Sequence, residues 1–341
     1  MKKRVFSFLT ALLTLAGLLA GCGGDGGRPA GDPALKSEVV ISISSEPTSL
    51  DPCKGWGHGT TPLVQSTLIE YRQDMSFAND LATGYTLSPD GLKWTFTLRD
   101  DVSFTDGEPL TASDVVFTFE TAKTSQTSLD LTFMERVEAV GDTTVVFTLT
   151  KPTSSFLNTV ATVGIVPEHA YGENYGVAPI GSGPFKFVQW NPQEQLILAA
   201  NEAYYGAVPA MKKVTIVFMD EDAALAAVRA GQVDIALTAA TLATAQIDGY
   251  TVRAVSSVDN RGLTLPVLPD EGKQTESGYP IGNDVTACIE IRKALAYGID
   301  RSLIAQNVLN GFADPCYSEN DGMPWNNPAV KIATDVDYAK R

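Results

Sequence analysis

Side chains that could perform catalysis are sparse in this chain. It has two histidines, His58 and His169, and lacks the GxSxG, HExxH and GxxxxGK patterns of serine hydrolases, zinc proteases and phosphate-binding loops. Residues 55–59 contain a GxGxG pattern, but it does not sit between a strand and a helix, as a dinucleotide-binding fingerprint must. We therefore expect a protein that is not an enzyme and that carries no cofactor.

Patterns that would bind a metal are also weak. The acidic triplet at 220–222 could form a cation site, but it stands where a helix should begin, and there carboxylates complement the helix dipole. No CxxC spacing exists, so structural zinc is not expected. Three cysteines lie beyond the N-terminal region, and because their number is odd at least one thiol stays unpaired; the pairing is left open among Cys53, Cys288 and Cys316.

The N-terminus has the pattern of an export signal. A basic start at 2–4 precedes an uncharged apolar run at 5–20, which is shorter than the ~20 residues of a membrane-spanning helix. The run ends in Leu-Ala-Gly-Cys, which resembles the bacterial lipobox; an ordinary signal peptide with an incidental cysteine is the alternative. We predict a lipoprotein signal peptide at 1–21, lipidation of Cys22 and a flexible Gly/Pro-rich tether at 22–37. The protein would then be lipid-anchored at the extracytoplasmic face of the cell membrane.

Composition is that of a globular protein. Of the 341 residues 44% are hydrophobic, and the length suggests about two domains. The formal net charge is −15, which repels phosphate backbones and argues against nucleic acid as a partner.

Short strands and helices alternate beyond the tether, which indicates the α/β class. A helix is predicted from Thr111, with Asp114 in the place of the usual Glu or Gln of a capping box. Another is predicted at 223–230, ended by Gly231 and followed by a strand at 233–237. Two further helices are expected at 285–297 and 300–310. Strands are predicted at 39–43, 94–98, 144–149, 185–190, 195–199 and 214–219.

Several segments, read together, resemble one family. They are EPTSLDP at 46–52, SPDGLKWTFTLRDDVSFTDGEPLTASDVVFTFE at 88–120, PIGSGPFKF at 179–187, NEAYYG at 201–206, AGQVDIA at 230–236 and IRKALAYGIDRSLI at 291–304. This set is similar to the family 5 extracellular solute-binding proteins, the receptors of ABC importers for oligopeptides, dipeptides, nickel and related chelates. The resemblance runs from about residue 39 to the last residue.

The resemblance implies a fold and a domain organisation. Family members have the two-lobed, type II periplasmic-binding-protein fold, an α/β clamshell with mixed sheets that closes around its solute. The first lobe would span 38–260, and 261–341 would be part of the second. Members of the family are longer than this chain, so the resemblance implies an incomplete second lobe and a C-terminal truncation. Whether the chain is a natural short form or a fragment is left open.

The resemblance also implies where a ligand would bind. Residues after the SLDP motif form part of the first-lobe cleft wall in the family, and here they are Cys53, Lys54, Gly55, Trp56, Gly57, His58, Gly59 and Thr60. The glycines would let backbone approach a ligand. Trp56 could stack on the ligand or belong to the lobe core, and His58 could bind ligand, ligate a metal or bond a neighbouring backbone group. Ser182 stands in a turn near the cleft and could contact the ligand or only shape the turn.

The function implied is capture of a peptide, nickel or a nickel chelate and its delivery to an ABC permease and its ATPase. The sequence leaves the choice of solute open. The alternative is a chemosensory or adhesive lipoprotein that uses the same cleft without transport.

Overall fold

The computed structural model describes residues 36–56, 62–72, 74, 76–125, 129–255, 259–323 and 326–341. The predicted signal peptide, Cys22 and nearly all of the tether lie outside these ranges. In the described part of the chain, no helix is long and apolar enough to cross a membrane.

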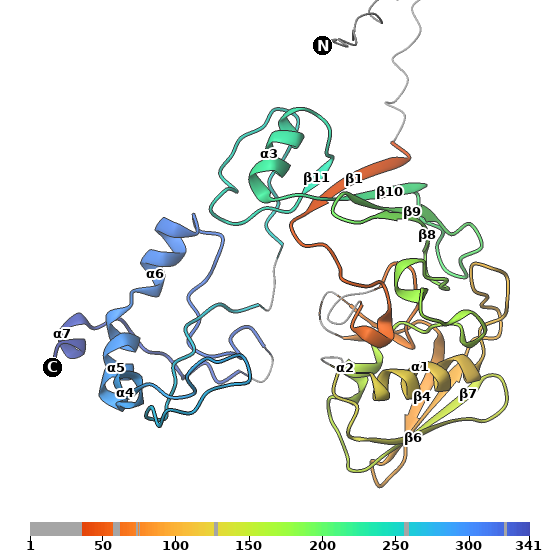
Figure 1. Cartoon of the computed structure of the whole chain (residues 1–341), viewed down its shortest axis with the longest axis horizontal. Helices are drawn as coiled ribbons and strands as arrows, with labels where there is room; N and C mark the ends of the chain where they lie inside the picture. The colour runs from red at the N-terminus through yellow and green to blue at the C-terminus, as the bar shows by residue number, and fades with distance from the viewer. Residues whose placement is uncertain are drawn as a thin grey trace, which may run out of the picture. The chain divides into compact units, whose positions relative to one another are not determined.

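A five-stranded mixed sheet contains the first strand of the described chain. Its order is β11-β1-β10-β9-β8 (Figure 1), formed by β1 (Glu38–Ile43), β8 (Phe185–Asn191), β9 (Gln195–Ala200), β10 (Lys213–Phe218) and β11 (Ile235–Ala236). β1 pairs in parallel with both β10 and β11, whereas β10, β9 and β8 are antiparallel. Four of the five strands fall at the predicted positions; the predicted strand at 233–237 shortens to two residues.

The segment β10–α3–β11 forms the predicted strand–helix–strand unit. Helix α3 (Glu221–Arg229) is capped by Asp220, whose carboxylate accepts a hydrogen bond from the Ala223 backbone N–H at 2.8 Å. Gly231 follows with φ 69°, a left-handed conformation that suits glycine after a helix. The two strands are not neighbours, because β1 lies between them.

A four-stranded antiparallel sheet builds the larger core. Its order is β4-β5-β7-β6, from β4 (Ala82–Leu87), β5 (Lys93–Leu98), β6 (Met134–Ala139) and β7 (Thr144–Leu149). Helix α1 (Ala112–Thr124) lies against this sheet (Figure 1). The Asp114 carboxylate accepts a hydrogen bond from the Thr111 backbone N–H at 2.9 Å, which confirms the Asp-containing capping interaction.

Aromatic rings fill the space between α1 and the sheet. Phe147 lies at the centre, with ring centroids 4.9 Å from Phe119, 5.2 Å from Phe156 and 5.7 Å from Phe96. All four side chains are fully buried, and such edge-on contacts stabilise beyond the buried area alone. Short elements complete this region: η1 (Pro52–Lys54), β2 (Ile69–Tyr71), β3 (Phe77–Asn79), α2 (Phe156–Val160), η2 (Glu168–Ala170) and η3 (Tyr175–Val177).

Residues beyond 259 form short helices with little buried surface. They are α4 (Asp284–Ala287), α5 (Ile289–Gly298), α6 (Arg301–Leu303), η4 (Ile304–Val308) and α7 (Val336–Ala339). The predicted helix at 285–297 is split at Cys288, where ψ is 118°, and the one at 300–310 ends in a π-helical turn. In the described residues from 259 onward, Ala305 is the one buried hydrophobic side chain.

Candidate functional site

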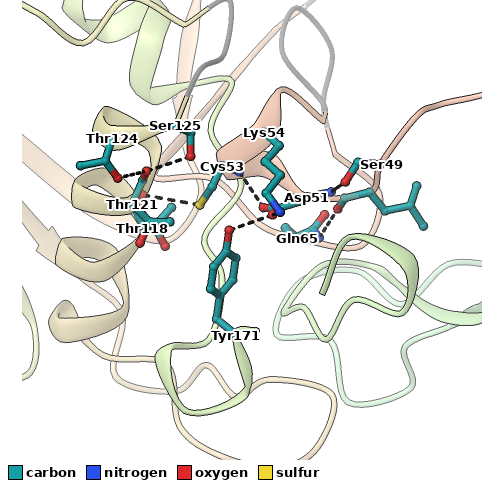
Figure 2. A network of polar contacts seen from close by, with 11 residues as sticks. Ser49, Asp51, Cys53, Lys54, Gln65, Thr118, Thr121, Thr124, Ser125 and Tyr171 are labelled. Atoms are coloured by element: carbon teal, nitrogen blue, oxygen red, sulfur yellow. Dashed lines mark hydrogen bonds and ion pairs between the residues drawn. The ribbon is translucent and has the colours of Figure 1, made fainter. Parts of the chain in front are cut away.

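Asp51 fixes the segment that leads from β1 to η1. Its side chain is fully buried, and its carboxylate accepts hydrogen bonds from the Cys53 backbone N–H at 2.9 Å and from the Tyr171 hydroxyl at 2.8 Å. Lys54 Nζ lies 3.5 Å from the same carboxylate (Figure 2). Because one buried anion holds all three groups, the chain after Pro52 has a defined course.

Gly55 ends this turn and positions Trp56. Its φ of 105° is one that other L-residues rarely adopt, so glycine fits here without strain. The Gly55 N–H donates to the Pro52 carbonyl at 3.2 Å, and the Trp56 N–H donates to the Asp51 carbonyl at 3.0 Å. Trp56 therefore follows directly from a hydrogen-bonded turn.

Gly55 and Trp56 line a pocket of about 460 Å³, within the size range of small-ligand sites. Its apolar floor comes from Leu196 on β9 and from Ile216 and Phe218 on β10. Ile216 and Phe218 are two residues apart and share one face of the sheet, and Ile216 pairs with Leu196. The sheet face thus supplies the floor, and the loop after β1 supplies the rim.

Trp56 is both a packing residue and a wall of this pocket. It is partly buried against the hydrophobic cluster of the five-stranded sheet, which includes Leu196 and Ile216. Its indole Nε1 is buried and has no hydrogen-bond partner among the described residues. A buried donor without a partner is uncommon in folded proteins.

The pocket is lined by two charged side chains, Glu46 and Lys54, which have different partners in the protein. Glu46 accepts a hydrogen bond from Trp190 Nε1 at 2.9 Å and from the Gln193 backbone N–H at 2.9 and 3.0 Å. Among the described residues, Asp51 is the ion-pair partner of Lys54, whose side chain is 54% exposed. The pocket lining therefore carries one ammonium, which is paired with the buried Asp51, and one carboxylate, which accepts hydrogen bonds from Trp190 and Gln193.

Cys53 belongs to the interior and not to a reactive centre. Its Sγ lies 3.6 Å from the Thr118 carbonyl, to which it donates (Figure 2). Burial, followed by the charge of Asp51, raises the pKa of the Cys53 thiol to about 12. A thiol held protonated in this way is a poor nucleophile. Cys53, Cys288 and Cys316 are all free thiols, so no disulfide joins them in this structure.

Ser182 lies in the interior and is not among the residues that line the pocket. It is fully buried, its Oγ has no hydrogen-bond partner among the described residues, and its carbonyl accepts from Ser66 Oγ at 3.1 Å. Gly181 packs so closely that an added Cβ would stand 2.0 Å from the Val64 carbonyl oxygen. The Gly183 N–H donates to that same carbonyl at 2.8 Å. The geometry of this turn is that of a junction between two chain segments.

The other predicted site residues lie outside the described part of the chain: Gly57, His58, Gly59, Thr60 and, at the N-terminus, Cys22. Within the described residues, no group of three or more His, Cys, Asp or Glu side chains is placed to hold a metal ion. In the acidic triplet, Asp220 caps α3 and Glu221 accepts from the Ala239 backbone N–H at 3.1 Å, which confirms the helix-start interpretation.

Sequence reasoning missed the floor of the pocket and the role of Glu46. Leu196, Ile216 and Phe218 read as ordinary strand residues, and nothing local links them to a loop more than a hundred residues earlier. For Glu46 the sequence carries a weak signal, because it opens the EPTSLDP segment, but its partners Trp190 and Gln193 are known only from the fold.

Comparison with known proteins shows which proteins this chain is similar to. The profile described as "Bacterial extracellular solute-binding proteins, family 5 Middle" matches residues 76–341. Protein XP55 of Streptomyces lividans is 32% identical over 93% of this chain and 57% of its own length. The oligopeptide-binding protein AppA of Bacillus subtilis is 27% identical over 99% of this chain and 64% of its own. The crystal structure of NikZ from Campylobacter jejuni in complex with Ni(L-His) superposes with a TM-score of 0.78 at 27% identity, over 89% of this chain and 62% of that one.

The chain therefore has the mixed α/β fold of the type II periplasmic binding proteins. It belongs to family 5 of the bacterial extracellular solute-binding proteins. It spans about three fifths of the length of these relatives.

Proposed function

We propose that this protein is the lipid-anchored substrate-binding component of an ABC importer, which captures its solute outside the cytoplasmic membrane and delivers it to a permease–ATPase complex. The observation that carries the proposal is family membership together with a pocket lined by residues 45–49 and 54–56, within and directly after the EPTSLDP segment. In this reading the protein binds and does not catalyse.

A short peptide is the solute that the pocket favours. Its floor is apolar and its rim carries hydroxyl, ammonium and carboxylate groups, a combination that suits a peptide with an apolar side chain. One relative is named as an oligopeptide-binding protein, and another was crystallised with Ni(L-His). Nickel or a nickel chelate is therefore the second candidate, and His58 would be its first protein ligand to test.

Thermal unfolding of the 341-residue protein would test the proposal. Three additions are compared: a mixture of tripeptides, Ni²⁺ alone, and Ni²⁺ with L-histidine. A ligand at 100 times its Kd should stabilise the protein by roughly 2.7 kcal/mol, which shifts the melting temperature by several degrees. Stabilisation by tripeptides only would support peptide capture, and stabilisation by Ni²⁺ with L-histidine only would support the chelate. No stabilisation by any of the three would contradict solute binding by this chain.

Delivery requires a test in cells. We expect deletion of the gene in the source organism to abolish uptake of whichever solute stabilises the protein, and expression of the intact gene to restore it. Unchanged uptake in the deletion strain would contradict the transport role while leaving solute binding in place.

A further inference from the structure

One wall of the pocket is the segment 45–49, which Glu46 joins to the hairpin of β8 and β9. Glu46 Oε1 accepts hydrogen bonds from Trp190 Nε1 and from the Gln193 backbone N–H, both at 2.9 Å, and Glu46 Oε2 lies 3.0 Å from that same backbone nitrogen. Trp190 belongs to β8, and Gln193 lies in the turn between β8 and β9. One carboxylate therefore connects the wall to a strand and a turn that lie far away in the sequence.

Trp190 lies in the same row of the sheet as the pocket floor. It pairs with Leu196 on β9, and Leu196 pairs with Ile216 on β10; Leu196 and Ile216 both line the pocket. Residues that pair directly across antiparallel strands point to the same face of a sheet. The hydrogen bond from Trp190 to Glu46 therefore connects the wall of the pocket with the sheet face that forms its floor.

The turn that Glu46 contacts has a strained backbone. Gln193 has a φ of 65°, and within the described residues it is one of two positions with positive φ that are not glycine. This left-handed conformation is unfavourable for a residue with a Cβ, and it persists where neighbouring contacts hold it in place. At Gln193 the backbone N–H has both oxygens of Glu46 within hydrogen-bond distance. The carboxylate thus supports the strained residue of the turn.

The wall is also held at its other end. The Leu50 N–H donates to the Gly176 carbonyl at 2.7 Å, and the Asp51 carboxylate accepts from the Tyr171 hydroxyl at 2.8 Å. The residues between these contacts and Glu46 line the pocket. A segment that is fixed at both ends has fewer conformations than one that is fixed at a single end, so a solute that binds against it loses less conformational entropy.

We propose that Glu46 is a positioning residue for solute binding, whose carboxylate holds the wall 45–49 against the sheet face by reaching Trp190 and Gln193. The inference rests on the proposed function and names a residue on which solute affinity depends. Glu46 acts here through its two protein partners. The length of its side chain, which brings the oxygens to both donors, is then the property that matters most.

Three substitutions at Glu46 separate the reach of the side chain from its charge. Glu46→Gln removes the charge and keeps one oxygen that can accept from both donors, as Oε1 does in the unaltered protein. Glu46→Asp keeps the charge on a side chain that is one methylene shorter, and Glu46→Ala removes both properties. We expect the dissociation constant to rise at least tenfold in the Asp and Ala variants and to stay within threefold in the Gln variant.

Isothermal titration of the 341-residue protein measures these constants, with the tripeptide Ala-Ala-Phe as one probe and Ni²⁺ with L-histidine as the other. Gln193→Gly is the matched control, because glycine adopts a positive φ without strain and keeps the N–H that Glu46 accepts. Its affinity should equal that of the unaltered protein. Unchanged affinity in the Ala variant would overturn the inference, and so would a loss in the Gln variant as large as that in the Ala variant, since the charge would then act on the solute directly.

The indole N–H signal of Trp190 in two-dimensional NMR spectra gives a readout that needs no solute. The chain has four tryptophans, and Trp190→Phe identifies the signal by its absence. We expect the signal to move upfield in the Asp and Ala variants, where the hydrogen bond is lost, and to stay near its original position in the Gln variant. A signal at the same position in all variants would overturn the inference.

The same spectra report whether each variant is folded, and if the Ala variant is not, the comparison of Asp with Gln decides. Binding of a probe that does not depend on Glu46 would contradict the inference and leave the proposed function in place. If neither probe binds the unaltered protein, both fail.

Discussion

At the residue scale, the protonation state of the partly buried Asp80 should affect the stability of the protein. Tyr205 contacts both the Asp80 carboxyl and Ser66 Oγ, and Ser66 Oγ lies 3.1 Å from the Ser182 carbonyl. The two hydroxyls supply two protons for these three contacts, and Asp80 would supply the third when it is protonated. Burial raises the pKa of Asp80, against hydrogen bonds from Tyr205 and Thr67 that lower it. The charged groups around it are Glu70, which also raises this pKa, and Arg99, which stacks 5.0 Å from the centroid of the Tyr205 ring.

Asp80→Asn should therefore remove part of the pH dependence of stability. A carboxyl whose folded pKa lies above its ordinary 3.8 contributes its stability fully below that value, and the contribution is lost as pH rises through the folded pKa. The asparagine amide can donate to Tyr205 at any pH. Relative to the unaltered protein, we expect the variant to have the larger free energy of unfolding at pH 7, with the difference vanishing toward pH 3.5. Urea unfolding across this range measures it, with the exposed Asp100→Asn as control. A difference in stability that does not change with pH would contradict a raised pKa of Asp80 in the folded protein.

Trp56→Leu tests whether the indole ring contributes to ligand binding in the pocket that Trp56 lines. Leucine keeps an apolar group against Leu196 and Ile216 but removes the indole ring and its unpartnered N–H. We expect ligand affinity, measured by titration with the solute that stabilises the protein, to fall by more than ~1 kcal/mol while the free energy of unfolding changes less. Loss of stability with unchanged affinity would show that Trp56 acts only as a packing residue.

At the scale of elements, the turn at 181–184 joins two parts of the chain through backbone contacts. Gly183 and Phe185 donate their N–H groups to the carbonyls of Val64 and Leu63 at 2.8 and 3.0 Å. Thr105 donates to the Gly181 carbonyl at 2.9 Å. These hydrogen bonds require the two backbones to lie close together. A side chain at position 181 would therefore push the two segments apart.

Gly181→Ala should destabilise the protein strongly. The new methyl group would stand 2.0 Å from the Val64 carbonyl oxygen and 2.7 Å from its carbonyl carbon, so the two segments would have to separate. We expect a loss of roughly 2 kcal/mol or more in the free energy of unfolding. Gly84→Ala is the matched control, since nothing lies within 4 Å of its added Cβ, and it should change stability by less than about 0.5 kcal/mol. Similar losses of stability from the two substitutions in urea unfolding would show that the backbone near Val64 can move away from a methyl group at position 181 at little cost.

At the scale of the whole molecule, buried apolar surface is distributed unevenly. The cores under the two sheets contain nearly all the buried hydrophobic side chains of the described residues. In contrast, Ile289, Ile291 and Leu295 of α5 are 54, 39 and 37% exposed. Segments with fewer buried contacts unfold locally at a lower cost in free energy. Helix α5 should therefore unfold locally more often than the strands of the two sheets.

Hydrogen exchange measures that difference. We expect amides of α5 to exchange at least a hundredfold faster than those of β9 and β10 in the same sample, a comparison that needs no second protein. Equal protection of the two regions would mean that α5 is stabilised by contacts other than those described.

Attachment to the membrane is predicted to depend on one atom, the sulfur of Cys22. We expect Cys22→Ala to abolish incorporation of labelled fatty acid and to move the protein out of the membrane fraction, with its thermal unfolding unchanged. Cys288→Ala, at an exposed free thiol, is the control. An unchanged membrane fraction in the Cys22 variant would contradict lipid anchoring.

The sequence by itself determined the features that depend on neighbours in the chain. The Asp220 cap, the Asp114 capping interaction, the β10–α3–β11 unit and most strand positions follow from periodicity, turn residues and hydrogen bonds that span a few residues. The motif segments also indicated the family, because their order is specific even where the role of each residue is not.

Only the tertiary structure decided which segments far apart in the sequence contact one another. The insertion of β1 between β10 and β11, the pocket floor from Leu196, Ile216 and Phe218, and the interior position of Ser182 all depend on contacts between residues far apart in the chain. Strand pairing and close backbone packing leave no local pattern in the sequence, because an apolar strand residue reads the same whether it faces a core or a pocket. The physical distinction lies in what packs against it, and that is a property of the fold.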